Sequence, residues 1–285
     1  MRFRTAFKSK LGLHALVLLV AALYVGPLGY VVMIALTPLN ETLGSWPHTL
    51  APGNFITAFE SADFLRFFIN SAVVSVTCTV IQVVLAASAG YALAQLPLPG
   101  RDILLLLLVG LIVVPAEISM VPLFVMVAHI PLAGGNDILG LGGQGWLDTL
   151  PGLMVPHLIG AMGVFLMRQF YAALPEELGN AARVDGAGEF RIFALIYTPL
   201  VRPALGIVGV LAFQGTWNDF LWPLIVTNSN SMKTLQLGLT GFFQENSTQW
   251  NLLMAAVIVV SIPVLVLFLA IQRVFTSGAL SGALK

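Results

Sequence analysis

ELGNAARVDGAGEFRIFALIYTP, residues 177–199, is a charged stretch with three glycines that lies between two long apolar segments. The rest of the chain avoids charge, since only 9% of the 285 residues are Asp, Glu, Lys or Arg, whereas 58% are hydrophobic and the mean hydropathy is +0.93. Charged residues make up about a quarter of a typical soluble domain. An apolar excess of this size cannot be buried in one soluble core, so we expect a membrane protein.

Six apolar segments are long enough to cross a bilayer, which takes about 20 apolar residues in a helix. We therefore predict an all-α membrane protein with a short N-terminal segment, residues 1–10, and one transmembrane domain, residues 11–285. Small residues at 86–90 predict the close approach of another helix. The predicted helices span roughly residues 11–36, 68–96, 103–130, 150–173, 200–227 and 252–275. Membrane helices tolerate proline, so we expect kinks and not breaks at Pro27, Pro115, Pro122, Pro156, Pro223 and Pro263.

The basic residues indicate the orientation of these helices. With the N-terminus in the cytoplasm, eleven of the 13 Lys and Arg residues lie on the inner side, and only Arg66 and Lys233 lie outside. Cytoplasmic loops carry such an excess of basic residues. We therefore predict that both termini and the loop at 174–199 are cytoplasmic. The first apolar segment exceeds the roughly 7–15 residues of a cleaved signal peptide, so we expect it to be retained.

The loop at 174–199 predicts two short helices joined by a turn. A proline and two glutamates at 175–177 suit the first turn of a helix, where the helix dipole favours carboxylates. We expect this helix to end near Val184, a turn at Asp185-Gly186, and a second helix that Pro199 ends. An amphipathic hairpin at the membrane interface is the alternative interpretation.

Within this loop, Ala181-Ala182 is followed by Gly186 and, after nine further residues, by Ile196 and then Pro199. This spacing resembles the EAA loop of ATP-binding-cassette (ABC) importer permeases. Asn180 replaces the Glu that usually opens the motif, and Thr198 replaces the Leu that usually precedes the proline. The resemblance covers nearly the whole chain, because further segments are similar to the maltose-permease-like branch of carbohydrate importers, at 187–193, 217–220, 248–256 and 272–283.

The resemblance implies a binding-protein-dependent permease of the plasma (inner) membrane that imports a sugar or oligosaccharide by alternating access. Its implied partners are a second homologous permease, two ATPase subunits that carry ATP and Mg, an extracytoplasmic solute-binding protein and the lipid bilayer. A glycerol-phosphate importer of the same family is an alternative. Two small alanines would keep one face of the first helix thin enough to enter a cleft on the ATPase. The residues implied in ATPase coupling are Glu177, Asn180, Ala181, Ala182, Asp185, Gly186, Ile196 and Pro199.

The sequence lacks the motifs of an enzyme. No G-x-x-x-x-G-K-[ST] phosphate loop occurs, so another chain must bind ATP, and we expect no cofactor and no catalytic residue here. The four histidines are scattered and the single cysteine has no ligand cluster, so we expect no metal site. Residues 140–145 satisfy G-x-G-x-x-G but follow no strand and open no helix, so we interpret them as a flexible loop. A net charge of zero argues against a nucleic-acid partner.

Polar side chains inside the predicted membrane helices are candidates for the translocation path, because burying them in lipid is costly. Gln214 and Asn218 share a helix face beside Trp217, which suits a path for sugar hydroxyls with an aromatic platform. Interhelical hydrogen bonds are the alternative role for these residues. A secondary transporter or channel that uses carboxylates for ion coupling is the alternative function. The path candidates are Glu117, Gln214, Trp217, Asn218 and Asp219.

Overall fold

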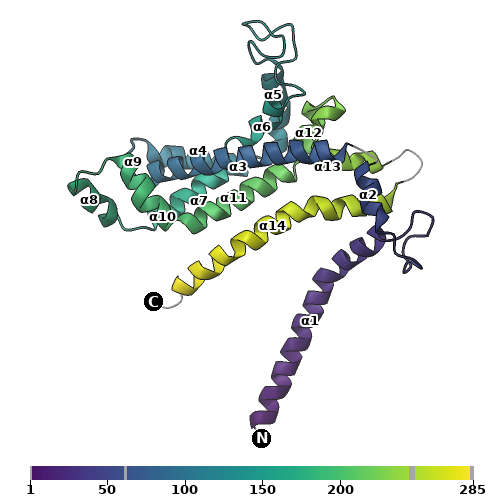
Figure 1. Ribbon diagram of the computed structural model, residues 1–285. Coiled ribbons are helices and arrows are strands. Elements are labelled where there is room, and N and C mark those ends of the chain that lie inside the picture. The colour runs from purple at the N-terminus through teal and green to yellow at the C-terminus, as the bar shows by residue number, and fades with distance from the viewer. Residues whose placement is uncertain (1, 61–62, 244–247, 283–285) are drawn as a thin grey trace. The chain divides into compact units, whose positions relative to one another are not determined.

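The computed structural model describes residues 2–60, 63–243 and 248–282. Regular structure in these residues is helical throughout, apart from an isolated bridge pair between Phe243 and Thr248, which confirms the all-α prediction. The α-helices of Figure 1 are α1 (Arg2–Ala35), α2 (Gly53–Glu60), α3 (Phe64–Gln95), α4 (Arg101–Val113), α5 (Ala116–Ala128), α6 (Leu150–Met154), α7 (Ala161–Ala172), α8 (Glu177–Val184), α9 (Glu189–Ile192), α10 (Thr198–Leu200), α11 (Arg202–Trp217), α12 (Leu221–Val226), α13 (Leu235–Gly238) and α14 (Trp250–Gly282). The shorter helical turns are η1 (Val155–His157), η2 (Phe193–Tyr197), η3 (Asn230–Met232) and η4 (Leu239–Phe242).

The chain divides into two compact units, one of residues 1–64 with 239–262 and one of residues 65–238 with 263–285. In the first unit, two buried asparagines join the end of α1 to α2 and to the start of α14. Asn54 Nδ2 donates to the carbonyl oxygens of Ala35 and Thr37 at 2.9 and 2.8 Å. Asn251 Nδ2 donates to those of Thr37 at 2.6 Å and Pro38 at 3.1 Å. These bonds satisfy carbonyl groups that the end of a helix leaves without a helical partner.

In the second unit, α3, α7 and α11 pack side by side (Figure 1). A Cβ atom at Gly90 of α3 would lie only 2.6 Å from the Cβ atom of Met167 in α7. A Cβ atom at Gly163 of α7 would lie 3.1 Å from Val208 in α11 and 3.3 Å from Ala86 in α3. The helices therefore approach each other at small residues, which confirms the predicted close approach at residues 86–90.

Three helical stretches are long and apolar enough to cross a membrane unbroken: Gly12–Ala35 of α1, all of α3, and Trp250–Gln272 of α14. The further spans exist only as bent helix pairs. The bend is 99° between α4 and α5, 46° between α6 with η1 and α7, and 82° between Glu189–Leu200 and α11. The described residues therefore hold three to six spans, and the prediction of continuous helices is wrong for the third and fourth. The 82° bend lies at the start of the predicted fifth helix, which is interrupted instead between α11 and α12.

One of these breaks coincides with a proline, Pro115 between α4 and α5, whereas Pro156 lies inside η1, just before the break that precedes α7. A proline lacks the backbone N–H and its ring displaces the preceding turn. The two halves of the first pair have 13 residues each, or about 20 Å of helix, whereas the hydrocarbon core is about 30 Å thick. The expected kink is thus a break here. The prolines that do lie inside long helices are Pro27, Pro122 and Pro263.

The loop between α5 and α6 is held by its own hydrogen bonds. Asn136 Nδ2 donates to two carbonyl oxygens of the preceding segment, and Asn136 Oδ1 accepts from the N–H of Gly143. Gly140 has a φ of +78°, and a Cβ atom there would overlap the carbonyl oxygen of His129. The glycines at 140–145 therefore serve the fold of this loop, and α6 begins only at Leu150.

Candidate functional site

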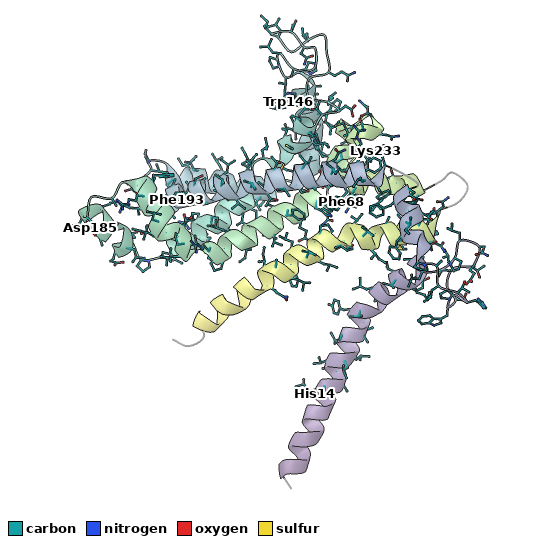
Figure 2. The ribbon with its side chains drawn as sticks, viewed as in Figure 1. His14, Phe68, Trp146, Asp185, Phe193 and Lys233 are labelled. Atoms are coloured by element: carbon teal, nitrogen blue, oxygen red, sulfur yellow. The ribbon has the colours of Figure 1, made fainter. Side chains whose placement is uncertain are left out.

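The charged stretch folds into a hairpin of short helices, residues 177–200. As predicted, α8 ends at Val184 and the second helix begins near Gly188, and Gly186 between them has a φ of +79°, which glycine adopts without strain. The second helix continues through η2, a π-helical turn, into α10. Such turns are frequent at functional sites. Figure 2 shows Asp185 at the tip of the hairpin and Phe193 at its base.

Pro199 does not end the second helix, contrary to the prediction. It lies in α10, which continues directly from the π-helical turn, and the helix runs on to Leu200. The chain bends only after Leu200, at Val201, from which α11 continues. The hairpin is thus joined to α11 through a bend and not through a proline break.

Only one of the two alanines lies on the outer face of α8. Ala181 is exposed, whereas Ala182 is 8% exposed and packs into a core with Ile192 and Tyr197. The prediction of a thin outer face made by both alanines is therefore wrong for Ala182, which lets α8 lie close to the bundle. Of the other predicted coupling residues, Glu177, Asn180, Asp185 and Gly186 are exposed, and Ile196 and Pro199 are partly buried.

Two of the exposed large apolar side chains of the hairpin project furthest into solvent. Val184 is 88% exposed and Phe190 is 81% exposed. Neither is among the predicted coupling residues, and both are exposed because the helices turn Ala182 and Ile192 inward instead. Exposed apolar side chains rimmed by polar residues are typical of a surface that binds another protein.

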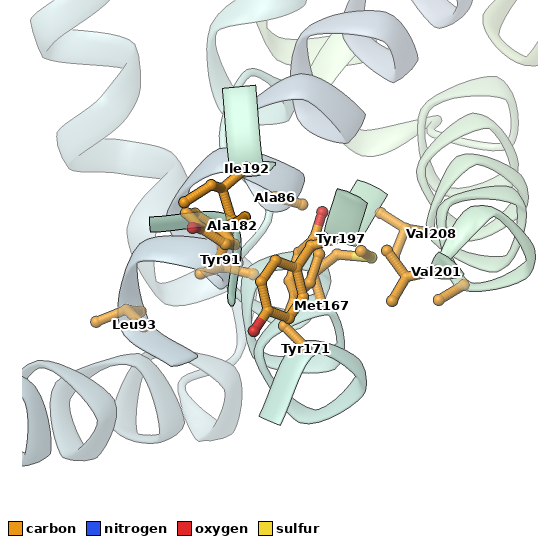
Figure 3. Packing of buried hydrophobic residues seen from close by; sticks show 12 residues of the cluster. Ala86, Tyr91, Leu93, Met167, Tyr171, Ala182, Ile192, Tyr197, Val201 and Val208 are labelled. Carbon is orange, nitrogen blue, oxygen red and sulfur yellow. The ribbon is translucent and has the colours of Figure 1, made fainter. Parts of the chain in front are cut away.

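A buried aromatic cluster fixes the base of the hairpin to α3 and α7 (Figure 3). The ring centroid of Tyr91 lies 5.7 Å from that of Tyr171, 5.2 Å from Phe193 and 5.5 Å from Tyr197. The hydroxyl groups of Tyr171 and Thr198 are 3.2 Å apart, so the cluster also has a polar contact. Tilted aromatic pairs at these distances stabilise a core beyond their burial alone.

Polar side chains form a second connection, on the flank of the hairpin. The guanidinium of Arg183 donates to both carboxylate oxygens of Glu189, from Nε to Oε1 at 2.6 Å and from Nη2 to Oε2 at 3.2 Å. Arg183 Nη1 also donates to Oδ1 of Asn180 at 2.9 Å. The hydroxyl of Tyr91 donates to Oε2 of Glu189 at 2.9 Å. The hydrogen bonds to Glu189 raise the pKa of the Arg183 guanidinium above its ordinary value.

Among the predicted path residues, Asp219 makes the most extensive contacts. It lies in the interruption between α11 and α12, and its Oδ2 is 2.9 Å from Nε2 of His157, at the break between η1 and α7. Asp219 Oδ1 accepts from the N–H of Trp222 at 3.4 Å. Gln82 of α3 donates to the carbonyl oxygen of His157 at 2.6 Å. Asp219 therefore makes an interhelical hydrogen bond, which was the alternative to a role in the translocation path.

The other path candidates have different surroundings. Gln214 and Asn218 are both exposed, and Asn218 Oδ1 accepts from Nε2 of Gln236 at 3.2 Å. Trp217 is 2% exposed and stacks on a phenylalanine ring of its own helix, so the predicted aromatic platform is wrong. Glu117 is exposed in the first turn of α5, where the helix dipole favours a carboxylate.

Within the described part of the chain, no three His, Cys, Asp or Glu residues gather where they could hold a metal ion.

Known transport proteins are similar to this chain over nearly its whole length. A family profile described as "Binding-protein-dependent transport system inner membrane component" matches residues 82–279. An arabinooligosaccharide transport system permease of Halalkalibacterium halodurans is 32% identical over 273 residues, which cover 93% of each chain. An sn-glycerol-3-phosphate transport system permease of Escherichia coli O157:H7 is 30% identical over 278 residues, 93% of this chain and 94% of the relative.

Solved structures show the same fold. A bacterial ABC transporter involved in the import of the acidic polysaccharide alginate has a chain that matches with a TM-score of 0.76 at 20% identity, covering 92% of this chain and 95% of that one. An alginate transporter in complex with a pentasaccharide-bound periplasmic protein matches with a TM-score of 0.64 at 15% identity, covering 96% of each chain. From the family profile and the relatives together, the chain belongs to the binding-protein-dependent permeases, the inner-membrane components of ABC importers.

Proposed function

We propose that this permease subunit imports a sugar or oligosaccharide by alternating access. Its partners would be a second homologous permease, two ATPase subunits and an extracytoplasmic solute-binding protein. Relatives are named for arabinooligosaccharide, alpha-glucoside and glycerol-phosphate transport, which supports this range of substrates. ATP and Mg would bind to the ATPase subunits, since this chain has no phosphate loop.

The hairpin is the observation that carries the proposal. Its tip presents Val184 and Phe190 beside a glycine turn, and its base is fixed to α3 and α7 by the aromatic cluster. An ATPase subunit docked on this tip would move the hairpin as one body when the ATPase pair closes on ATP. Such a displacement would bias the bundle from an inward-facing to an outward-facing arrangement, and the release of ADP would reverse it.

The break at Asp219 and His157 is our candidate for part of the substrate path. Interrupted membrane helices expose polar backbone groups, and transporters use them to form substrate sites. The exposed amides of Gln214 and Asn218 lie in the same stretch of chain and suit sugar hydroxyls. We propose these amides, with Asp219 positioning the broken helices.

Charge favours a sugar over a glycerol phosphate as the substrate. The path candidates include two carboxylates, Glu117 and Asp219, and no Lys or Arg. Like charges repel strongly where the dielectric constant is low, so a phosphate ester would need a basic partner, and the basic side chain at this break, His157, already contacts Asp219. A neutral sugar needs only hydrogen-bond donors and acceptors.

The test begins with the solute-binding protein. A thermal-stabilisation screen of that protein against sugars and glycerol phosphates identifies the ligand, and the complete complex is then placed in vesicles with ATP on the hairpin side. We expect uptake to require ATP and the binding protein and to be insensitive to ionophores. Uptake without ATP, driven by a proton or sodium gradient, would instead support a secondary transporter.

A single substitution tests the hairpin. Valine at position 186 cannot adopt the φ of +79° without strain, so Gly186→Val should open the turn, reduce uptake about tenfold or more, and release the ATPase or uncouple its hydrolysis. Gly188→Val is the matched control, because Gly188 has a φ of −73° and open space around its Cβ position. Uptake and co-purification of the ATPase are measured. Normal import by Gly186→Val with the ATPase attached would show that the hairpin is not the coupling element.

A further inference from the structure

The polar contacts on the flank of the hairpin have a geometry that the docking role alone does not require. Arg183 lies in the last turn of α8 and Glu189 in the first turn of α9, so their ion pair spans the Gly186 turn. The two parallel hydrogen bonds between a guanidinium and a carboxylate fix the orientation of the two groups as well as their distance. The pair therefore keeps the two halves of the hairpin in one relative arrangement.

Tyr91 extends this arrangement to the membrane bundle. It belongs to α3, 98 residues away from Glu189 in the chain, and its hydroxyl donates to the carboxylate oxygen that Arg183 Nη2 also contacts. The ring of Tyr91 is 4% exposed and held by the aromatic cluster, so the donor has a fixed position. Glu189 is thus held from α8 on one side and from α3 on the other.

These contacts contribute little to the stability of the fold. The side chains of Arg183 and Glu189 are 36% and 45% exposed, beside a cavity of about 460 Å³ that Gln95, Arg101 and Asn180 also line. Water screens an ion pair at such a site, so its contribution to the stability of the fold is small. The aromatic cluster and the buried alanine of α8 would keep the hairpin folded without it. This contact fixes the orientation of its groups but adds little to the free energy of unfolding. It is therefore suited to positioning the hairpin relative to α3.

We propose that Tyr91, Arg183 and Glu189 form a latch that transmits movement of the hairpin to α3, and that these are positioning residues for transport. This inference rests on the proposed function, because it assumes that the ATPase moves the hairpin. With the latch closed, the hairpin carries α3 with it. Without the latch, the hairpin acts on the bundle only through the aromatic contacts and through its covalent connections to α7 and α11.

The test removes one hydroxyl group. Tyr91→Phe keeps the ring in the cluster and loses the bond to Glu189, so the ATPase should co-purify and hydrolyse ATP normally, and the unfolding temperature of the complex should not change. The number of substrate molecules imported per ATP should fall by about tenfold or more, the loss expected for one hydrogen bond to a charged group. Tyr171→Phe is the control, because it removes a hydroxyl from the same cluster that bonds Thr198 and not Glu189.

A second set of variants tests the ion pair. Arg183→Gln and Glu189→Gln should each lower import per ATP, and the double variant should be no worse than either alone, since both break the same contact. Arg191→Gln, an exposed arginine of α9 outside the latch, is the charge-matched control and should import normally. Additive losses in the double variant would contradict a shared latch.

The outcomes separate the latch from the proposed function. Normal import per ATP by Tyr91→Phe, together with uncoupling by Gly186→Val, would overturn the latch and leave the coupling role of the hairpin in place. Release of the ATPase by Tyr91→Phe would also overturn it, because the residue would then act in docking. Normal import by Gly186→Val with the ATPase attached would contradict the proposed function itself.

Discussion

Neighbouring residues of the same type have opposite roles in this hairpin. Ala181 and Ala182 are chemically identical, yet successive positions on a helix point about 100° apart. Ala181 therefore lies on the outer face of α8, and Ala182 lies against the bundle. The face that a partner would meet is set by helix phase, and the sequence pattern alone could not separate the two alanines.

The two alanines give a matched pair of predictions. Ala182→Trp should overpack the core and destabilise the protein by about 1–3 kcal/mol, seen as a lower unfolding temperature. Ala181→Trp should leave that temperature unchanged and block docking, seen as loss of the ATPase on purification. If Ala181→Trp retains the ATPase and imports normally, the outer face of α8 is not the docking face.

The residues that sequence reasoning missed have partners far away in the chain. His157 is bonded to Asp219, 62 residues on, and Tyr91 to Glu189, 98 residues on. A signal for His157 was present, because a carboxylate in an apolar segment requires a hydrogen-bond donor. Which donor it finds depends on the packing of α3, α7 and α11, which no local pattern encodes. The turn at Gly186 could be predicted because its cause is local.

At the scale of elements, hydropathy predicts how much chain lies in the membrane but not how it bends. The straight spans in α1, α3 and α14 agree with the predicted ranges to within a few residues. The bend at Val201 lies between Pro199 and Pro203, close to the predicted start of the fifth membrane helix at residue 200, so the sequence indicates a boundary there but not its angle. The α4–α5 break is different, because Pro115 lies at it. There the proline breaks the helix, whereas we predicted only a kink.

The carboxylate of Asp148 anchors the loop between α5 and α6 to the segment after α12, and the pH dependence of this contact can be measured. Asp148 Oδ1 accepts hydrogen bonds from the backbone N–H groups of Asn228 and Ser229, both at 3.0 Å. Burial raises the pKa of Asp148, but the hydrogen bonds from Ser229 and Asn228 outweigh it, so the pKa lies below its ordinary value. A carboxyl whose pKa is lowered by folding stabilises the folded state above its unfolded pKa, and this contribution is lost as the pH falls through the folded pKa.

We therefore expect the anchor to persist between about pH 5 and 8, since both limits lie above the ordinary pKa of an aspartate. Hydrogen exchange at the amides of Asn228 and Ser229, corrected for intrinsic rates, should be constant over this range. Asp148→Ala should speed exchange by about tenfold to a hundredfold, the expected effect of losing a hydrogen bond to a charged group. A marked rise in exchange of the native protein on going from pH 8 to pH 5 would contradict the anchor.

At the scale of the whole molecule, the orientation in the membrane decides whether the hairpin can meet an ATPase. The split of eleven basic residues against two is a property of the sequence and does not depend on the fold. The charge split and the shape of the hairpin are separate observations. A direct measurement of membrane orientation therefore tests the charge split without assuming that the hairpin binds an ATPase.

Single cysteines provide that measurement, in a protein whose buried Cys78 is replaced by alanine. Cysteines introduced at Ser9 and Gly188 should be shielded from an impermeant thiol reagent in intact cells, and one at Ser231 should react. All three should react after the cells are opened, which controls for accessibility. Labelling of Gly188→Cys from outside would place the hairpin on the wrong side for an ATPase.

The π-helical turn at Phe193–Tyr197 gives this segment tolerance to a change in its length. A π turn holds one more residue than an α turn, and each residue of an α-helix advances the chain by about 100°. Deleting one residue there would let the turn relax to α geometry and would leave the residues after the turn in phase with those before it. A deletion of one residue in α8 has no such turn to absorb it and would rotate the later positions of that helix by about 100°, so the hairpin should tolerate a shorter chain in the π turn better than in α8.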